Sequence, residues 1–236
     1  MAVLQKQLLK NDKSKGKKLK TLISASLLGS DLSNLGHEAF KAVKSGADWI
    51  HVDVMDGHFV ESISFGAAVQ ASVLGSLQNE SFFIDTHLMV SCPDRQIGFF
   101  ANSGSNMITF HAESQSDIDH TVNKIHRAGL MAGLAIKPST PVDAVMPFLE
   151  KLEMVLVMTV EPGYGGQGFL SYTLPKIAEI RKRADEVKPS LMIEVDGGIN
   201  DETAPLVINA GADVLVSGTY LFGANYMKDA IEKIRR

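Results

Sequence analysis

Cysteine is nearly absent from this 236-residue sequence, which contains only Cys92. One thiol can form neither an intrachain disulfide nor a metal site built from several thiolates, so a reducing cytoplasm is the expected compartment. Long apolar runs are also missing, because none approaches the ~20 residues that a membrane-spanning helix needs. No Walker loop is present, and no Gly-x-Gly-x-x-Gly motif follows the first apolar run, which argues against a nucleotide cofactor.

A strong overall charge is lacking as well. The formal net charge is −4, which gives no general reason to expect nucleic acid or an anionic membrane as a partner. Residues 1–20 carry seven lysines and one acid, but they have neither the apolar core of a secretory signal nor the arginines of a mitochondrial presequence. We therefore expect residues 1–20 to be a solvated, flexible Lys-rich extension and residues 21–236 to form one catalytic domain.

From Leu22 onward, short apolar runs alternate with longer amphipathic segments. The apolar runs are 22–27, 49–54, 82–90, 107–110, 131–136, 154–160, 191–195 and 214–216. The helix-like segments are 32–45, 67–77, 93–102, 116–128, 141–149, 174–187, 202–210 and 226–235. Near-continuous apolar runs are typical of parallel strands buried on both faces, and parallel strands need crossovers that are usually helical. The fold class predicted is α/β, a single-domain (β/α)8 TIM barrel, with an open doubly wound sheet as the alternative.

Glycine follows several of the helix-like segments, at Gly46, Gly104, Gly129 and Gly211. A glycine just past the end of a helix supplies the left-handed residue that ends it. These four positions are therefore predicted helix ends.

Polar residues gather where several of these strands would end. In a (β/α)8 barrel the active site lies at the carboxyl ends of the strands. Residues two apart on a strand point to the same face, so three strands present aligned polar or sulfur-containing side chains. These are His51, Asp53 and Met55 in the second run, Asp85, His87 and Met89 in the third, and Asp196 after the seventh; the first run carries Ser24 and Ser26.

Four of these residues are candidate metal ligands: His51, Asp53, His87 and Asp196. Burying several charges without partners costs several kcal/mol each, and one divalent cation would neutralise them. The mixed nitrogen and oxygen set suits zinc, iron, manganese or cobalt better than calcium or magnesium. The alternative for each histidine is an ordinary hydrogen-bonded core residue. We expect Asp85 to be a buried support.

Glycine-rich segments follow the last three predicted strands. They are Glu161–Gly168, Gly197-Gly198 and Ser217-Gly218-Thr219. Backbone N–H groups in such segments can close on a phosphate, so we predict a phosphate site there, with plain turns as the alternative. Lys137 ends the fifth strand, where a Schiff-base lysine is conceivable, but the following Pro138-Ser139-Thr140-Pro141 favours a structural loop.

These motifs together resemble the ribulose-phosphate 3-epimerase family from Leu22 to Arg236. The matching blocks are SLLGSD (26–31), HVDVMDGHFV (51–60), DTHLMV (85–90), GLAIKP (133–138), VMTVEPGYGGQ (157–167), EVDGG (194–198) and VSGT (216–219). The resemblance implies a ribulose-phosphate-binding barrel of the pentose phosphate pathway. Its implied reaction interconverts D-ribulose 5-phosphate and D-xylulose 5-phosphate by two-base 1,1-proton transfer through a metal-stabilised 2,3-enediolate.

The resemblance also implies roles for individual residues. Asp53 and Asp196 fall on the family's proton-transfer groups, and His51, Asp53, His87 and Asp196 on its ligands for one divalent ion (Zn, Fe, Mn or Co). The implied substrate contacts are Ser26, His87, Gly163, Tyr164, Gly165, Gly166, Asp196, Gly197, Gly198, Gly218 and Thr219. Met55, Met89 and Met158 would line the pocket. The expected partner is a small sugar phosphate, with no nucleic acid and no membrane, and the expected assembly is a cytoplasmic homo-oligomer.

The chain departs from the family pattern near the first and second strands. Ala25 stands where proline is usual, Glu61-Ser62 where Pro-Asn is common, and Ser139 where glycine is usual. These changes leave open a 3-epimerase of a ketohexose 6-phosphate such as D-allulose 6-phosphate. A sugar-phosphate decarboxylase or aldol synthase would need an Asp-x-Lys arrangement, and the sequence offers His51-Val-Asp53 and Asp85-Thr-His87 instead. A non-catalytic protein on a decayed enzyme scaffold would be expected to have lost ligands, and all four are present.

Overall fold

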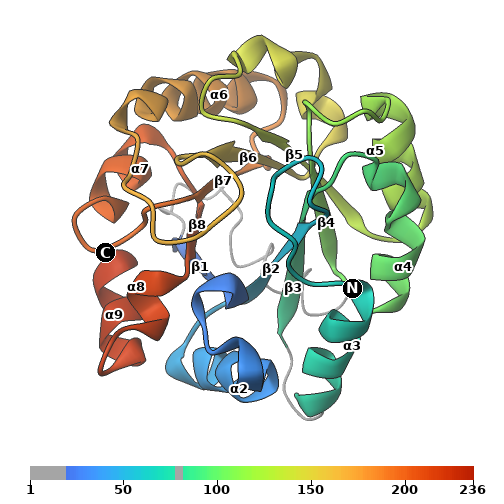
Figure 1. Ribbon diagram of the computed structural model, residues 1–236. Coiled ribbons are helices and arrows are strands. Elements are labelled where there is room, and N and C mark those ends of the chain that lie inside the picture. The colour runs from blue at the N-terminus through green and yellow to red at the C-terminus, as the bar shows by residue number, and fades with distance from the viewer. Residues whose placement is uncertain (1–19, 78–81) are drawn as a thin grey trace.

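Eight parallel strands close into a barrel in chain order in the computed structural model, which describes residues 20–77 and 82–236. Helices surround the strands on the outside (Figure 1). Closure comes from β1 pairing with β8, where Leu22 lies opposite Val214. The predicted (β/α)8 barrel is therefore confirmed, and the open doubly wound alternative is wrong. Residues 1–19 of the predicted Lys-rich extension lie outside the described residues.

The strands begin and end close to the predicted apolar runs. They are β1 (Leu22–Ser26), β2 (Trp49–Met55), β3 (Phe83–Met89), β4 (Met107–His111), β5 (Met131–Ile136), β6 (Met154–Met158), β7 (Met192–Asp196) and β8 (Val214–Ser217). Nearly every residue in them is buried. One face of each strand packs inside the barrel and the other packs against helices, which is why the runs are almost continuously apolar.

The helices follow the predicted alternation. The α-helices are α2 (Leu35–Ser45), α3 (Ala67–Ser76), α4 (Ile97–Asn102), α5 (Ile118–Arg127), α6 (Leu174–Val187), α7 (Ala204–Ala210), α8 (Thr219–Phe222) and α9 (Met227–Ile234). The 3₁₀ segments are η2 (Leu27–Gly29), η3 (Leu32–Asn34), η4 (Pro93–Arg95), η5 (Val142–Ala144), η6 (Met146–Lys151) and η7 (Ser171–Thr173). The four glycines predicted to end helices all have positive φ, which confirms that prediction.

One predicted helix differs in kind. Residues 141–149 form the two 3₁₀ segments η5 and η6 rather than an α-helix. Pro147 lies in the first turn of η6, and a proline disfavours the α conformation of the residue before it and donates no hydrogen bond. The short helix α8 directly after β8 was not predicted.

An apolar layer closes the amino-terminal end of the barrel. It is formed by the first residue of each strand: Leu22, Trp49, Phe83, Met107, Met154, Met192 and Val214, with Met131 packed against them. The rings of Trp49 and Phe83 have centroids 4.4 Å apart. Polar side chains further along the strands are therefore reached only from the carboxyl ends, where the active site of this fold lies.

The polar layers above this apolar layer follow from the two-residue period of a strand. Two residues beyond the apolar layer lie Ser24, His51, Asp85, Thr109 and Glu194, and two residues beyond those lie Ser26, Asp53, His87, His111 and Asp196. All are buried except Asp196, which is partly exposed at the barrel mouth. In the described part of the chain, no helix is long and apolar enough to cross a bilayer.

Candidate active site and metal centre

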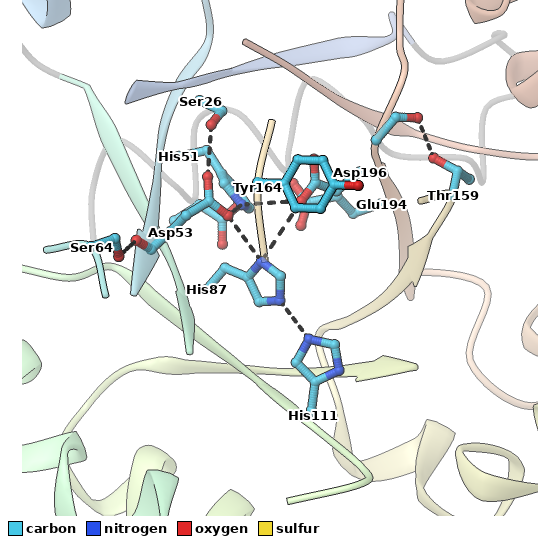
Figure 2. Close-up of polar contacts among 12 residues, drawn as sticks. Ser26, His51, Asp53, Ser64, His87, His111, Thr159, Tyr164, Glu194 and Asp196 are labelled. Carbon is cyan, nitrogen blue, oxygen red and sulfur yellow. Dashed lines mark hydrogen bonds and ion pairs between the residues drawn. The ribbon is translucent and has the colours of Figure 1, made fainter. Parts of the chain in front are cut away.

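The four candidate ligands meet at the carboxyl ends of β2, β3 and β7 (Figure 2). Asp53 Oδ1 lies 3.2 Å from His51 Nε2 and 3.2 Å from His87 Nδ1. Asp196 Oδ2 lies 3.9 Å and 3.8 Å from the same two nitrogens. Ligand atoms placed ~2.0–2.2 Å from one zinc-like ion are separated by roughly 3–4 Å, so this spacing fits a single divalent ion.

An unsatisfied nitrogen provides a second test of that fit. His51 Nε2 is fully buried and has no hydrogen-bond partner within residues 20–77 and 82–236. A buried polar atom without a partner costs about 1–3 kcal/mol, whereas a metal ligand atom is satisfied by the ion. The donor set of two imidazoles and two carboxylates also suits a transition-metal ion.

Asp85 lies behind His51, as expected for a buried support. Its Oδ2 is 2.6 Å from His51 Nδ1, which turns Nε2 of that ring toward the other ligands. Glu194 lies beside this pair, with Oε1 4.0 Å from His51 Nδ1. Burial, and then the charge of Asp85, raise the pKa of Glu194 well above its usual value. Sequence reasoning missed Glu194, although it stands two residues before Asp196 on the same face of β7.

His87 is held from both sides of its ring. Nδ1 lies 3.2 Å from Asp53 Oδ1, and Nε2 lies 2.9 Å from Nε2 of His111. His111 Nδ1 in turn lies 3.1 Å from Oε2 of Glu113. The predicted fourth run ended at Phe110, one residue short of His111, so sequence reasoning missed both residues; extending the two-residue period from Met107 would have found His111.

The two candidate proton-transfer groups have opposite electrostatic environments. Burial raises the pKa of Asp53, but the electrostatic attraction of the neighbouring His51 and His87 imidazoles outweighs it and holds that pKa far below its usual range. Burial, followed by the charge of Asp53, raises the pKa of Asp196 to about 6. One carboxylate is thus strongly ionised and the other takes up a proton readily, which is the pairing that a proton-abstracting and proton-returning site requires.

A cavity of about 320 Å³ opens above these groups, within the size range of small-molecule sites. Its lining includes most of the residues that sequence reasoning named: Ser26, Asp53, Met55, Met89, Met158, Gly163, Tyr164, Gly165, Gly166, Asp196, Gly197, Gly198, Gly218 and Thr219. His51 and His87 are not part of this lining, but both contact Asp53 and Asp196, which are. The structure therefore brings every predicted site residue to one place.

The glycine-rich loops pack too closely to accept side chains at one key position. Gly198 has φ +68°, and a Cβ there would lie 2.7 Å from the backbone nitrogen of Phe169. The loop after β7 can lie against the loop after β6 only because residue 198 has no side chain. The loop after β6 also approaches the loop after β2, since a Cβ on Gly163 would lie 3.5 Å from Val60.

The contacts of Asp56 and Lys137 stabilise loops of the fold. Asp56 Oδ1 accepts hydrogen bonds from the backbone N–H groups of His58 and Phe59, and its Oδ2 accepts one from Ser91, so it organises the loop after β2. The Lys137 ammonium lies 4.2 Å from the centre of the Phe59 ring. This position favours the structural interpretation of Lys137 over a Schiff-base lysine.

A comparison with known protein families shows which family the chain belongs to. The model of the ribulose-phosphate 3 epimerase family matches residues 22–222. The chain belongs to the ribulose-phosphate 3-epimerase family. Among curated members, it is 44% identical to the ribulose-phosphate 3-epimerase of Bacillus subtilis over 214 residues, covering 90% of this chain and 97% of that one. It is 42% identical to the enzyme of the same name from Schizosaccharomyces pombe, covering 90% and 92%.

Solved structures of other proteins share the fold. Tryptophan synthase subunit alpha from Legionella pneumophila superposes with a TM-score of 0.67 at 16% identity, covering 99% of this chain and 97% of that one. At that identity the likeness shows the barrel alone. Membership of this family identifies the chain as an epimerase and confirms the resemblance seen in the sequence.

Proposed function

We propose that this epimerase interconverts D-ribulose 5-phosphate and D-xylulose 5-phosphate by two-base 1,1-proton transfer in a metal-dependent reaction. One observation carries the proposal: Asp53 and Asp196 contact the same two buried imidazoles at the floor of a cavity that ends in glycine-rich loops. The names of the curated relatives support the choice of sugar.

Inverting C3 next to a ketone requires that a proton leave one face of the carbon and another arrive at the opposite face. Two positioned acid–base groups perform this task. Asp53 comes from β2 and Asp196 from β7, which are separated around the barrel by β1 and β8, so the two carboxyl groups approach the cavity from different strands. In one direction Asp53 removes the C3 proton and Asp196 returns one; in the reverse direction they exchange roles. The intermediate is the 2,3-enediolate.

The residues that would hold the ion are His51 through Nε2, His87 through Nδ1, and the carboxylates of Asp53 and Asp196. Zinc, iron, manganese and cobalt suit this donor set. When bound, such an ion supplies positive charge next to the oxygens on which negative charge develops.

The rest of the cavity would bind and shield the substrate. Gly163, Gly165, Gly166, Gly197, Gly198, Gly218 and Thr219 would surround the phosphate with backbone N–H groups, with Tyr164 beside them. Ser26 and His87 would contact the sugar. Met55, Met89 and Met158 would exclude water from the reacting carbons without competing for the proton.

The test compares the purified protein with Asp196→Asn. We expect the rate of epimerisation of ribulose 5-phosphate to fall by roughly 10²–10⁴-fold from the lost proton transfer, with a further loss from the missing ligand. In D₂O, one of the two epimers should still exchange its C3 proton for deuterium in this variant, because Asp53 still removes that proton. Asp143→Asn in η5, at an exposed aspartate, is the matched control and should retain the wild-type rate. An unchanged rate in Asp196→Asn would overturn the proposal.

Two further arms address the metal and the sugar. Chelation should abolish activity, and the ion that restores it identifies the metal. Turnover of ribulose 5-phosphate should exceed that of allulose 6-phosphate; the reverse order would make the enzyme a ketohexose 6-phosphate 3-epimerase, which the departures at Glu61-Ser62 leave open.

We also propose that residues 21–236 are the catalytic domain, that residues 1–20 are a Lys-rich extension outside it, and that the enzyme acts as a cytoplasmic homo-oligomer in the pentose phosphate pathway. The match of the family model to residues 22–222 supports the domain boundary. The single cysteine supports a reducing compartment. Truncation of residues 1–20 with full retention of activity would support the boundary, and light scattering would give the assembly.

A further inference from the structure

We propose that His111 and Glu113 form a positioning pair, which fixes the tautomer and ring orientation of His87 so that its Nδ1 is free to bind the ion. This inference rests on the proposed metal dependence of the site. It concerns two residues on β4 and just after it, outside the four candidate ligands and outside the residues that contact substrate in the proposed function.

A directed chain of hydrogen bonds carries the inference. His87 Nε2 and His111 Nε2 are 2.9 Å apart, so one of them donates its proton to the other. His111 Nδ1 lies 3.1 Å from Oε2 of Glu113, an acceptor when ionised, so Nδ1 of His111 carries the proton. A neutral imidazole has one N–H. His111 Nε2 is then the acceptor, and His87 must carry its proton on Nε2.

The consequence for His87 is a bare Nδ1. This nitrogen faces Asp53 Oδ1 at 3.2 Å and Asp196 Oδ2 at 3.8 Å, among the candidate ligand atoms. The opposite tautomer would place a proton on Nδ1 and donate it to Asp53 Oδ1, and Nδ1 could then not bind an ion. A metal-binding histidine usually donates its other N–H to an acceptor that sets its tautomer, and His111 is that acceptor here.

Glu113 is itself anchored by the loop after β5. Its Oε1 accepts a hydrogen bond of 2.8 Å from the backbone N–H of Lys137 and another from the hydroxyl of Thr140. These bonds hold it in the ionised form, and although burial acts in the other direction, the pKa of Glu113 falls to about 2. Because Glu113 is held in this way, it can fix the orientation of the buried His111 ring from the loop that follows β4.

The pair is also shielded. His111 is fully buried, and its ring packs against Phe59 with centroids 4.8 Å apart. Its two ring nitrogens lie within hydrogen-bond distance of Glu113 and His87. By contrast, His51 Nδ1 is hydrogen-bonded directly to a carboxylate, because Oδ2 of Asp85 lies 2.6 Å away. The two candidate imidazole ligands are therefore oriented by different means.

The test measures binding of Zn²⁺ to the metal-stripped protein, by competition with a chelator of known affinity. His111→Phe keeps a ring against Phe59 but removes the acceptor, and we expect its Zn²⁺ affinity to fall by roughly 10–100-fold. His111→Gln returns an acceptor oxygen near the position of Nε2 and should recover most of that loss. Glu113→Gln should give an intermediate loss, because Glu113 would no longer compel His111 Nδ1 to carry the proton.

Thr109→Val is the matched control. Thr109 lies two residues earlier on the same face of β4, is fully buried, and its hydroxyl has no hydrogen-bond partner among the residues that the structure describes. It should bind Zn²⁺ as tightly as the wild type. In the zinc-loaded wild type, the ¹⁵N shifts of the His87 ring should show a protonated Nε2 and a metal-bound Nδ1.

Three results would overturn the inference. They are a wild-type Zn²⁺ affinity in His111→Phe, an equal loss in His111→Gln and His111→Phe, and a protonated Nδ1 in zinc-loaded His87. If His111→Phe does not fold, Glu113→Gln and the ¹⁵N shifts decide alone. A wild-type protein that binds no Zn²⁺ would overturn the proposed metal dependence as well, whereas tight wild-type binding with no effect of His111→Phe overturns this inference only.

Discussion

The hydroxyl of Ser26 donates a 2.7 Å hydrogen bond to Oδ2 of Asp53, whose other oxygen, Oδ1, faces both candidate imidazole ligands. Ser26 ends β1, and the register of β1 with β2 places it opposite His51. The two oxygens of one carboxylate are thus given different partners by neighbouring strands. This arrangement fixes the plane of the carboxylate that is proposed to remove the substrate proton.

Removing that hydroxyl should slow the reaction. A hydrogen bond to a charged group contributes about 1.5–3 kcal/mol, which corresponds to roughly a 10–100-fold loss in kcat if the geometry of Asp53 matters in the transition state. Steady-state kinetics of Ser26→Ala would measure it. Ser24→Ala is the control, because the Ser24 hydroxyl has no hydrogen-bond partner in the described ranges 20–77 and 82–236. Equal rates in the two variants would contradict the prediction.

The buried acids behind His51 should differ in their response to amide substitution. Asp85 Oδ2 accepts a hydrogen bond from His51 Nδ1, so Asp85→Asn should weaken metal binding by roughly 10–100-fold. Neither oxygen of the fully buried Glu194 has a hydrogen-bond partner in the part of the chain that the structure describes. A buried negative charge without a hydrogen bond is costly, and the nearby charge of Asp85 raises the pKa of Glu194 further. We therefore expect Glu194 to be protonated already and Glu194→Gln to retain its metal. Metal content after dialysis checks both variants, and the reverse ranking would count against this assignment.

Substitution of two loop glycines by alanine should affect different properties, stability at Gly198 and substrate binding at Gly165. A Cβ at Gly198 would lie 2.7 Å from the backbone of Phe169, and φ is +68°, so Gly198→Ala should lower the free energy of unfolding by on the order of 1–3 kcal/mol. A Cβ at Gly165 would lie 3.7 Å from Thr219 Oγ1, which is ordinary contact, but it would enter the cavity. Gly165→Ala should keep its Tm and raise KM roughly tenfold, or about 1.4 kcal/mol of binding. Calorimetry and kinetics test the pair, and a matching loss of Tm in both variants would refute it.

Glu113 should link stability to pH. Burial opposes its ionisation, but the hydrogen bond with His111 and those from Thr140 and Lys137 lower its pKa from 4.5 to about 2. Since the folded pKa lies below the unfolded one, the stabilisation is complete above about pH 4.5 and is lost as the pH falls toward about 2. Between about pH 6 and pH 3, the wild type should lose on the order of 1–2 kcal/mol more unfolding free energy than Glu113→Gln, after allowance for partial exposure. Urea denaturation at each pH measures the difference, and parallel pH profiles would argue against it.

Local patterns predicted most of the fold but not every helix. The predicted segment 174–187 coincides with α6, because its apolar period is uninterrupted. The segment 141–149 became two 3₁₀ stretches because of Pro147, a constraint that periodicity alone does not register. The helix α8 is too short to show a period at all.

The candidate site divides in a similar way. His51, Asp53, His87 and Asp196 were found because side chains two apart on a strand share a face, and because the carboxyl ends of parallel strands meet. Glu194 and His111 obey the same period and were within reach of the sequence. Glu113 was not, because it follows β4 in a loop and is held in place by Lys137 and Thr140 from another loop.

The sequence by itself therefore determined the barrel, the end of it that carries the chemistry, and the side chains that meet there, since strand period and chain order follow from local residue patterns. Only the tertiary structure decided which nitrogen each imidazole presents. That choice depends on the hydrogen-bond partner of the other nitrogen, and the partners, Asp85 for His51 and His111 for His87, come from different strands of the closed barrel.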